Sequence, residues 1–319
     1  MHLTSLSLNS LAIGLASAVK PAWLTGPSIW LNLWAVALFV FGLVVTLRKN
    51  QPTATGVDRI IRFGPMFFAV PLGFFGMQHF ALFEAVKPAV PDWMPWPSFW
   101  TYFVGAALIA ACFSILTGIK ADLAGWSLGV MFILFLLMIY LPNLVENPHD
   151  RFAISNPLRD LSLCMGALAL AWARTWTGSA EGRRRRLRWL ATAVRWIFGV
   201  TILYFGVEQF LHPEYAPGVP LEPLLPAWFP GHIAVACVTG TILVAGSLCI
   251  LADKAARWAA TAVGVLYLLL VAFVYMPMEI AHPSVEISGE LDFVASTLAV
   301  GGAALLVAGT SVMSQSKRC

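Results

Sequence analysis

The sequence predicts an all-α, polytopic membrane protein. Of its 319 residues, 59% are hydrophobic and only 11% are charged, and the mean hydropathy is +0.78. Soluble domains usually carry about 25% charged residues, whereas long uncharged apolar stretches are typical of membrane spans. The chain also repeats itself, because residues 91–170 align with 226–305 without a gap. Together these observations predict two parallel-repeat four-helix bundles plus one extra N-terminal transmembrane helix.

Nine stretches are long enough to cross a bilayer as helices. A hydrocarbon core of about 30 Å needs about 20 apolar residues per helix. Two of the nine spans, at about 156–176 and from Trp189 to Phe210, carry charges near their ends or charges that can reach the interface. The other seven are uncharged runs at 21–47, 63–83, 93–119, 123–145, 223–252, 258–278 and 293–316.

The repeat divides the chain into four parts. They are an N-terminal segment (1–59) with the extra helix at about 27–47, a first four-helix unit (60–177), a basic linker (178–188) and a second unit (189–313). The aligned residues include Pro91, Trp93 and Pro95 with Pro226, Trp228 and Pro230, and Tyr140 and Pro142 with Tyr275 and Pro277. An even number of helices returns the chain to its starting side. We therefore expect the units to be related by an axis along the membrane normal.

The basic residues predict the orientation, because cytoplasmic loops carry the excess of Lys and Arg. With the N-terminus outside and the C-terminus in the cytoplasm, 16 of the 20 basic residues fall on the inner side, and all six histidines fall on or near the outer side. The run "RRRR" at 183–186 is interpreted as a topology anchor, with binding of anionic lipid or a partner as the alternative. The first 26 residues are expected to be an uncleaved outer segment, with a cleaved signal peptide as the alternative.

Several short motifs occur once in each unit. They are the helix endings "FFGMQHF" and "YFGVEQF", the loops "VPDWMPWP" and "LPAWFPG", and the segments "YLPN…NP" and "YMPM…HP". With these motifs each unit resembles the four-helix unit of the DoxX-like membrane protein family, which commonly has one such unit per chain. Some members are associated with thiosulfate:quinone oxidoreductase or with oxidative-stress membrane complexes. The resemblance implies the fold first, and quinone-linked redox chemistry second.

Polar side chains gather where the apolar helices end on the predicted outer side. An ionisable group inside hydrocarbon is costly and is a functional candidate by default. Glu208 ends such a helix, and Tyr275 closes the eighth span at the same level, so both are candidate catalytic residues. The candidate cofactor-binding residues are the polar residues beside or aligned with these two: Gln78, His79, Tyr140 and Gln209.

The depth of Glu208 depends on which arginine marks the inner boundary of its helix. Glu208 lies about 20 Å from Arg195 at the helical rise, which is inside hydrocarbon, but about 30 Å from Arg188, which is at the rim. We expect Glu208 to share a pocket with Tyr275, His212 or Glu279. A rim carboxylate that points into water is the alternative.

Glu and His residues also recur at spacings that suit a metal ion. Imidazole and carboxylate groups three or four positions apart can hold Zn, Fe or Cu. Glu208, His212, Glu279 and His282 therefore form a candidate metal site. Helix-capping and rim residues are the alternative interpretation, and a quinone is the other candidate cofactor.

Three classes of function are open. The favoured one is an accessory or membrane subunit of a redox system, quinone-linked by resemblance, in the cell inner (plasma) membrane, with a polar extracytoplasmic site and an extracytoplasmic or membrane redox partner. A non-catalytic membrane scaffold or assembly protein is the alternative. A small-molecule transporter is disfavoured, because the midplane of the third, fourth, seventh and eighth spans offers only Ser and Thr. The net charge of +4 is too small to suggest nucleic-acid binding.

The predicted topology can be tested with reporter fusions. Fusions after Lys120 and Asp253 should report the cytoplasm, because basic residues favour the cytoplasmic side for these two loops. Fusions after His149 and Glu286 should report the opposite side. Activity of alkaline phosphatase and fluorescence of green fluorescent protein at each site give the readout. One reversed site would contradict either the number of spans or their orientation.

Overall fold

The computed structural model describes residues 27–49, 56–178, 181–219, 224–226, 231–281 and 290–315. Almost all of this part of the chain is helical. Within it there is no strand, only an isolated bridge between Tyr215 and Leu224. The protein is therefore all-α, as the sequence predicts.

The first half of the chain contains one helix followed by a set of four long helices. After α2 (Pro27–Arg48) and the short α3 (Val57–Ile61), the first set comprises α4, α6, α7 and α9. Their bounds, with the short elements between them, are α4 (Gly64–Ala81), α5 (Phe83–Val86), η2 (Lys87–Ala89), α6 (Pro97–Thr117), α7 (Ala121–Phe135), η3 (Leu136–Tyr140), α8 (Leu141–Glu146) and α9 (Arg151–Gly178).

The second half contains a second set of four long helices, α10, α11, α12 and α14. Their bounds, with the short elements between them, are α10 (Glu181–Leu211), α11 (His232–Leu251), α12 (Ala256–Leu270), η4 (Val271–Tyr275), α13 (Met276–Ala281) and α14 (Glu290–Gln315). The expected span 223–252 is thus shorter than predicted. The helix begins only at His232, after the αL residue Gly231, because the preceding Pro-rich segment disfavours helix.

Eight helical segments in the described residues are long and apolar enough to cross a membrane. They include α2, the joined α3–α4 and α7–α8 segments, and the part of α10 from Trp189 to Leu211. α9 has 28 residues and lies in the same bundle, but it is not one of the eight. It carries Arg159, Asp160 and Arg174 along its length. The structure therefore supports a multi-pass membrane protein with eight candidate spans.

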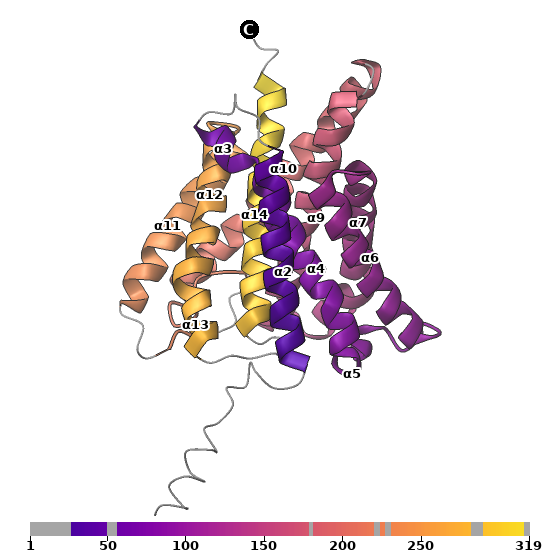
Figure 1. Ribbon diagram of the computed structural model, residues 1–319. Helices are drawn as coiled ribbons and strands as arrows, with labels where there is room; N and C mark the ends of the chain where they lie inside the picture. Colours follow the sequence, from indigo (N-terminus) through magenta and orange to yellow (C-terminus); the bar gives the residue numbers. More distant parts are fainter. Residues whose placement is uncertain are drawn as a thin grey trace, which may run out of the picture.

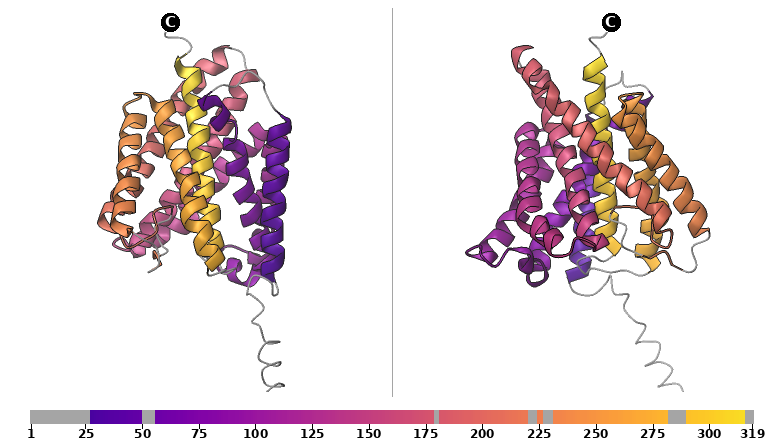
Figure 2. Two further views of the ribbon diagram at one scale, coloured as in Figure 1. Left: turned by 60° about the vertical axis from the view of Figure 1, so that its left-hand side comes forward. Right: turned by 180° about the vertical axis from the view of Figure 1, so that it is seen from behind.

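α14 is the central helix of the molecule (Figures 1 and 2). It packs against α4 and α9 of the first set and against α12 of its own set. Buried Ala and Gly residues make up much of its length, and small side chains let helix backbones approach closely in a membrane. A Cβ atom added at Gly302 would lie 2.3 Å from the backbone N of Phe68 on α4, so this crossing requires glycine.

The two sets are joined in a reciprocal way. α4, the first helix of one set, packs against α14, the last helix of the other, while α10 packs against α9. The last helices, α9 and α14, also pack against each other. Four helices thus form the interface between the two sets, and α6, α7, α11 and α12 lie outside it.

Elements that follow the Pro-rich loop of each set match in the two sets at positions 135 residues apart. The π-helical turn η3 matches η4, and the αL residue Lys120 before α7 matches Ala255 before α12. Close contacts match as well: Gly76 on α4 meets Gly105 on α6, and Gly206 on α10 meets Gly240 on α11.

One end of the bundle carries α3 and the C-terminal end of α14, and the other end carries α5 and α13 (Figure 1). α2, α6 and α9 finish at the first of these ends, where α7 and α10 begin. The described segments that the basic residues assign to the cytoplasm therefore lie together at this end, which we call the basic end. Its orientation in a cell stays a prediction.

The close α4–α14 crossing gives a stability prediction. Replacing Gly302 with Ala should lower the free energy of unfolding by about 1 to 3 kcal/mol, because the new methyl group overlaps the α4 backbone. Thermal or denaturant unfolding of the purified protein in detergent measures the change. Gly309→Ala is the matched control on the same helix, since the nearest atom to its new Cβ is 3.7 Å away. Equal stability of the two variants would contradict this account of the crossing.

Candidate functional site

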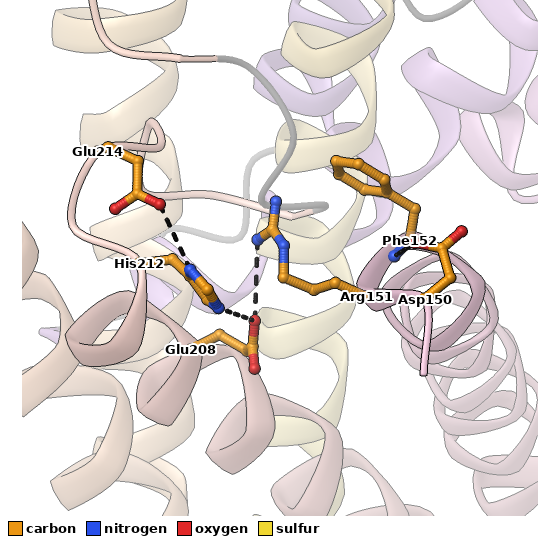
Figure 3. Close-up of polar contacts among 6 residues, drawn as sticks. All are labelled: Asp150, Arg151, Phe152, Glu208, His212 and Glu214. Carbon is orange, nitrogen blue, oxygen red and sulfur yellow. Dashed lines mark hydrogen bonds and ion pairs between the residues drawn. The ribbon is translucent and has the colours of Figure 1, made fainter. Parts of the chain in front are cut away.

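Glu208 lies beside Arg151 at the end of the bundle opposite the basic end. Glu208 is one turn before the C-terminus of α10, and Arg151 is the first residue of α9, so the pair joins the two sets of helices. An Nη1 atom of Arg151 is 3.7 Å from Oε2 of Glu208 (Figure 3). The Arg151 guanidinium also lies over the Tyr215 ring at 3.9 Å from its centroid, and cation–π attraction holds it there.

His212 and Glu214 extend this pair toward the surface. His212 Nε2 is 4.0 Å from Glu208 Oε2, and His212 Nδ1 is 3.3 Å from Glu214 Oε1 (Figure 3). Glu208 and His212 share one helical face because they are four residues apart. The exposed fraction of the side chains rises along the series, from 13% for Glu208 to 38% for His212 and 52% for Glu214. We call Arg151, Glu208, His212 and Glu214 the outer cluster.

The contacts of Arg195 show where Glu208 lies along the length of the bundle. Arg195 is buried and forms an ion pair with Asp253, which lies in the turn between α11 and α12 at the basic end. Arg195 is therefore level with that turn, although α10 itself begins at Glu181, and Glu208 lies about 20 Å further along α10. The Glu208 side chain is largely buried at the outer end of the bundle, and its depth in a membrane stays a prediction.

A second polar group lies at the interface between α9 and η3. Nε of Arg159 donates to Oδ1 of Asp160 at 2.9 Å, and Nη2 of Arg159 donates to the Tyr140 hydroxyl at 3.1 Å. Asp160 is buried. We call Tyr140, Arg159 and Asp160 the buried network. It places a guanidinium, a carboxylate and a phenol together among apolar helices.

The buried network is extended by α4 and α14. Nε2 of Gln78 donates to Oδ1 of Asp292 at 3.1 Å, and Asp292 adds a favourable electrostatic interaction with Arg159. Gln78 of the first set is thus hydrogen-bonded to the second set. Like Glu208, it reaches the last helix of the opposite set.

The remaining predicted site residues have contacts of their own with groups other than Glu208. Tyr275 is buried and donates to the Ala216 carbonyl at 3.3 Å, packed against Gly218, so it holds the segment after α10. His79 Nδ1 is 2.8 Å from the Phe75 carbonyl of its own helix, and Gln209 accepts from Thr239. Glu279 is buried on α13.

Of the three partners expected for Glu208, the structure brings only His212 beside it. Its other partner is Arg151, from the opposite set of helices. The contact is therefore between the two sets and not inside the second bundle.

The candidate metal site finds no support in the described part of the chain. Within those residues, no group of three or more His, Cys, Asp or Glu side chains could hold a metal ion. Glu208 and His212 lie close together, Glu279 is buried on α13, and His282 is outside the described residues.

Arg151, Arg159, Asp160 and Asp292 are the polar residues that sequence reasoning missed as site residues. Each is a charged residue inside or at the end of a helix of the bundle. A charge in such a position indicates a candidate functional residue, and this signal was present in the sequence. Sequence reasoning treated Arg159 and Asp160 only as charges that a membrane span tolerates.

Comparison with protein-family models, with curated proteins and with solved structures found no match. Fold and site together define a multi-pass helical membrane protein with two sets of four helices and polar clusters at one end.

The Arg151–Glu208 pair gives a second stability prediction. Arg151→Gln and Glu208→Gln should each lower the free energy of unfolding by about 1 to 3 kcal/mol, because each leaves a largely buried charge without its partner. The double variant should lose less than the sum of the two, which a double-mutant cycle in detergent measures.

Glu84→Gln is the control for this cycle, since Glu84 is an exposed carboxylate at the same end of the bundle. It should leave stability unchanged. Strict additivity of the Arg151 and Glu208 changes would show that the two charges do not interact.

Proposed function

We propose that the protein is built from two parallel four-helix units, with α9 as a ninth span and the basic end in the cytoplasm. The matching positions of η3 and η4, the matching glycine contacts and the reciprocal packing of α4 on α14 and α10 on α9 support the repeat. The grouping of basic segments at one end supports the orientation. The DoxX-like resemblance and a location in the inner membrane belong to the same proposal.

We further propose that the protein is a membrane subunit of a quinone-linked redox system. The observation that carries this proposal is the buried network, where Arg159 holds the Tyr140 hydroxyl beside Asp160 among apolar helices. A buried charge pair is costly in a membrane and marks a functional site by default. A quinone supplies two carbonyl oxygens that take up protons on reduction, with electrons from a redox partner.

The chemistry of the donors fits a quinone headgroup. A phenol and a guanidinium both donate hydrogen bonds to a carbonyl oxygen, and the guanidinium stays charged while it does so. Apolar helices around these donors suit the ring and its isoprenoid tail. Tyr140 and Arg159 are therefore the residues that would bind the headgroup, and Asp160 would orient Arg159.

The outer cluster suits proton movement between the aqueous face and the membrane. Glu214, His212 and Glu208 form a series of titratable groups whose side chains become steadily less exposed. Imidazole and carboxylate side chains are the usual proton carriers at such positions. Arg151 lies beside Glu208 at the least exposed end of this series.

A second candidate function is a membrane scaffold without chemistry. Two polar contacts, Glu208 with Arg151 and Gln78 with Asp292, each join the two sets of helices. Contacts of this kind fix how the two sets pack, and they need no reaction to explain them. Binding of a quinone distinguishes the two functions.

The redox proposal predicts specific quinone binding. The purified protein in lipid nanodiscs should bind a short-chain ubiquinone or menaquinone analogue, measured by quenching of its tryptophan fluorescence. Tyr140→Phe should weaken binding about five- to tenfold, since one hydrogen bond to the headgroup is lost. Tyr102→Phe is the control, because Tyr102 is exposed and stacks on Phe83.

Two outcomes would reject the quinone site. One is binding no tighter than to nanodiscs without protein, which would favour the scaffold. The other is equal loss of binding in Tyr140→Phe and Tyr102→Phe, which would place any quinone elsewhere. Thermal unfolding of both variants checks that each is folded.

A further inference from the structure

A cavity of about 520 Å³ opens at the basic end, away from both polar clusters. The ends of α2, α6 and α9, together with α3 and the start of α4, surround it. Three of its lining residues are cationic, namely Lys49, Arg62 and Arg174, and one, Asp58, is anionic. Its chemistry therefore differs from that of the outer cluster and the buried network.

Two of the lining cations, Lys49 and Arg174, both lie close to Gly118. Gly118 ends α6 with φ +82°, and a Cβ atom added there would lie 3.1 Å from Lys49 Nζ and 3.7 Å from an Arg174 Nη atom. Lys49 Nζ also donates to the Leu116 and Thr117 carbonyls at 2.7 and 2.6 Å, which fixes its position. Two cations from helices far apart in the sequence are thus held at the same place.

The acidic residue of the lining has a partner outside the cavity wall. Asp58 forms an ion pair with Arg257 of α12, which is not part of the cavity wall. Burial lowers the pKa of Lys49, and the positive charge of Arg174 lowers it further. An anion between these two cations would oppose this lowering of the Lys49 pKa, since an opposite charge within a few ångströms favours the charged form.

The rest of the wall is apolar. Met66, Ile115 and Leu116 are buried, and Ile61 and Pro65 line the cavity beside them. A cavity wall with both cationic and apolar side chains matches a phosphate group that carries a hydrocarbon portion. Basic pockets between membrane helices at the cytoplasmic side bind lipid headgroups of this kind.

We propose that this cavity is a binding site for a phosphate-bearing anion, with Lys49, Arg62 and Arg174 as the groups that contact the phosphate. A lipid headgroup and a free phosphate compound share this chemistry. The proposal is independent of the redox function, because it concerns the opposite end of the bundle and none of the same residues.

Native mass spectrometry of the full-length protein in detergent tests the site. Phosphatidylglycerol should bind at least fivefold more tightly than the zwitterionic phosphatidylcholine. Arg174→Gln should reduce this preference about fivefold, the usual effect of one cation near an anionic headgroup. Lys49 is kept, because its loss would also uncap α6.

Two further variants make the test robust. Arg62→Gln should reduce binding like Arg174→Gln, so the test does not depend on the folding of one variant. Lys254→Gln is the matched control, since Lys254 is an exposed cation at the same end outside the cavity. It should bind like the unchanged protein.

Inorganic phosphate and pyrophosphate distinguish the two sources of the anion. If either one displaces phosphatidylglycerol and raises the unfolding temperature, the site takes a soluble phosphate compound. If neither does so while phosphatidylglycerol binds, the ligand is a lipid. No preference for phosphatidylglycerol together with no effect of phosphate, or equal binding by Arg174→Gln and Lys254→Gln, would overturn the proposal.

Discussion

Hydrocarbon offers no hydrogen-bonding partner, so each polar side chain inside this bundle needs one from the protein itself. Several of these partners come from the other set of helices. Glu208 of α10 meets Arg151 of α9, and Gln78 of α4 meets Asp292 of α14. Ser162 and Thr201 form a further hydrogen bond between α9 and α10 at 3.1 Å. These contacts select one way of packing the two sets, because any rotation between them would separate the partners.

Close packing of small residues supports the same arrangement. Without a hydrophobic driving force between helices in lipid, association depends on contact area and on internal hydrogen bonds. Gly302 on α14 meets the α4 backbone, and a Cβ atom added at Gly166 on α9 would lie 2.5 Å from Ala303 Cβ. Backbones this close bring polar side chains on neighbouring helices within reach of each other. Packing at the centre and polar pairing at one end therefore act together.

The membrane helices and their lengths could be predicted from the sequence, because a span needs an apolar run long enough to cross the hydrocarbon core. α2 and α6 lie within a few residues of the predicted spans, and the class of membrane protein follows from the same apolar runs. The boundary of α9 was not readable in this way. It begins at Arg151 and not near 156, and this extra turn is what places the guanidinium beside Glu208.

The partners of the site residues were even less predictable. Hydropathy and spacing place Glu208, Tyr275 and Glu279 at one level, but they do not say which face of each helix meets which neighbour. That depends on the crossing of α4, α9, α10 and α14, set by side-chain volumes across long separations. Tyr140 and Tyr275 align in sequence, yet one contacts Arg159 and the other the Ala216 carbonyl.

The π-helical turns η3 and η4 determine where these two tyrosines point. Each turn ends on its tyrosine and is followed two residues later by a proline, Pro142 or Pro277. A π-helical turn holds one residue more than an α-helical turn, and one residue corresponds to about 100° around the helix axis. The extra residue thus shifts the phase of everything after it. Deleting one residue from η3 would carry the Tyr140 hydroxyl a quarter-turn away from Arg159 while leaving the hydropathy of the segment almost unchanged.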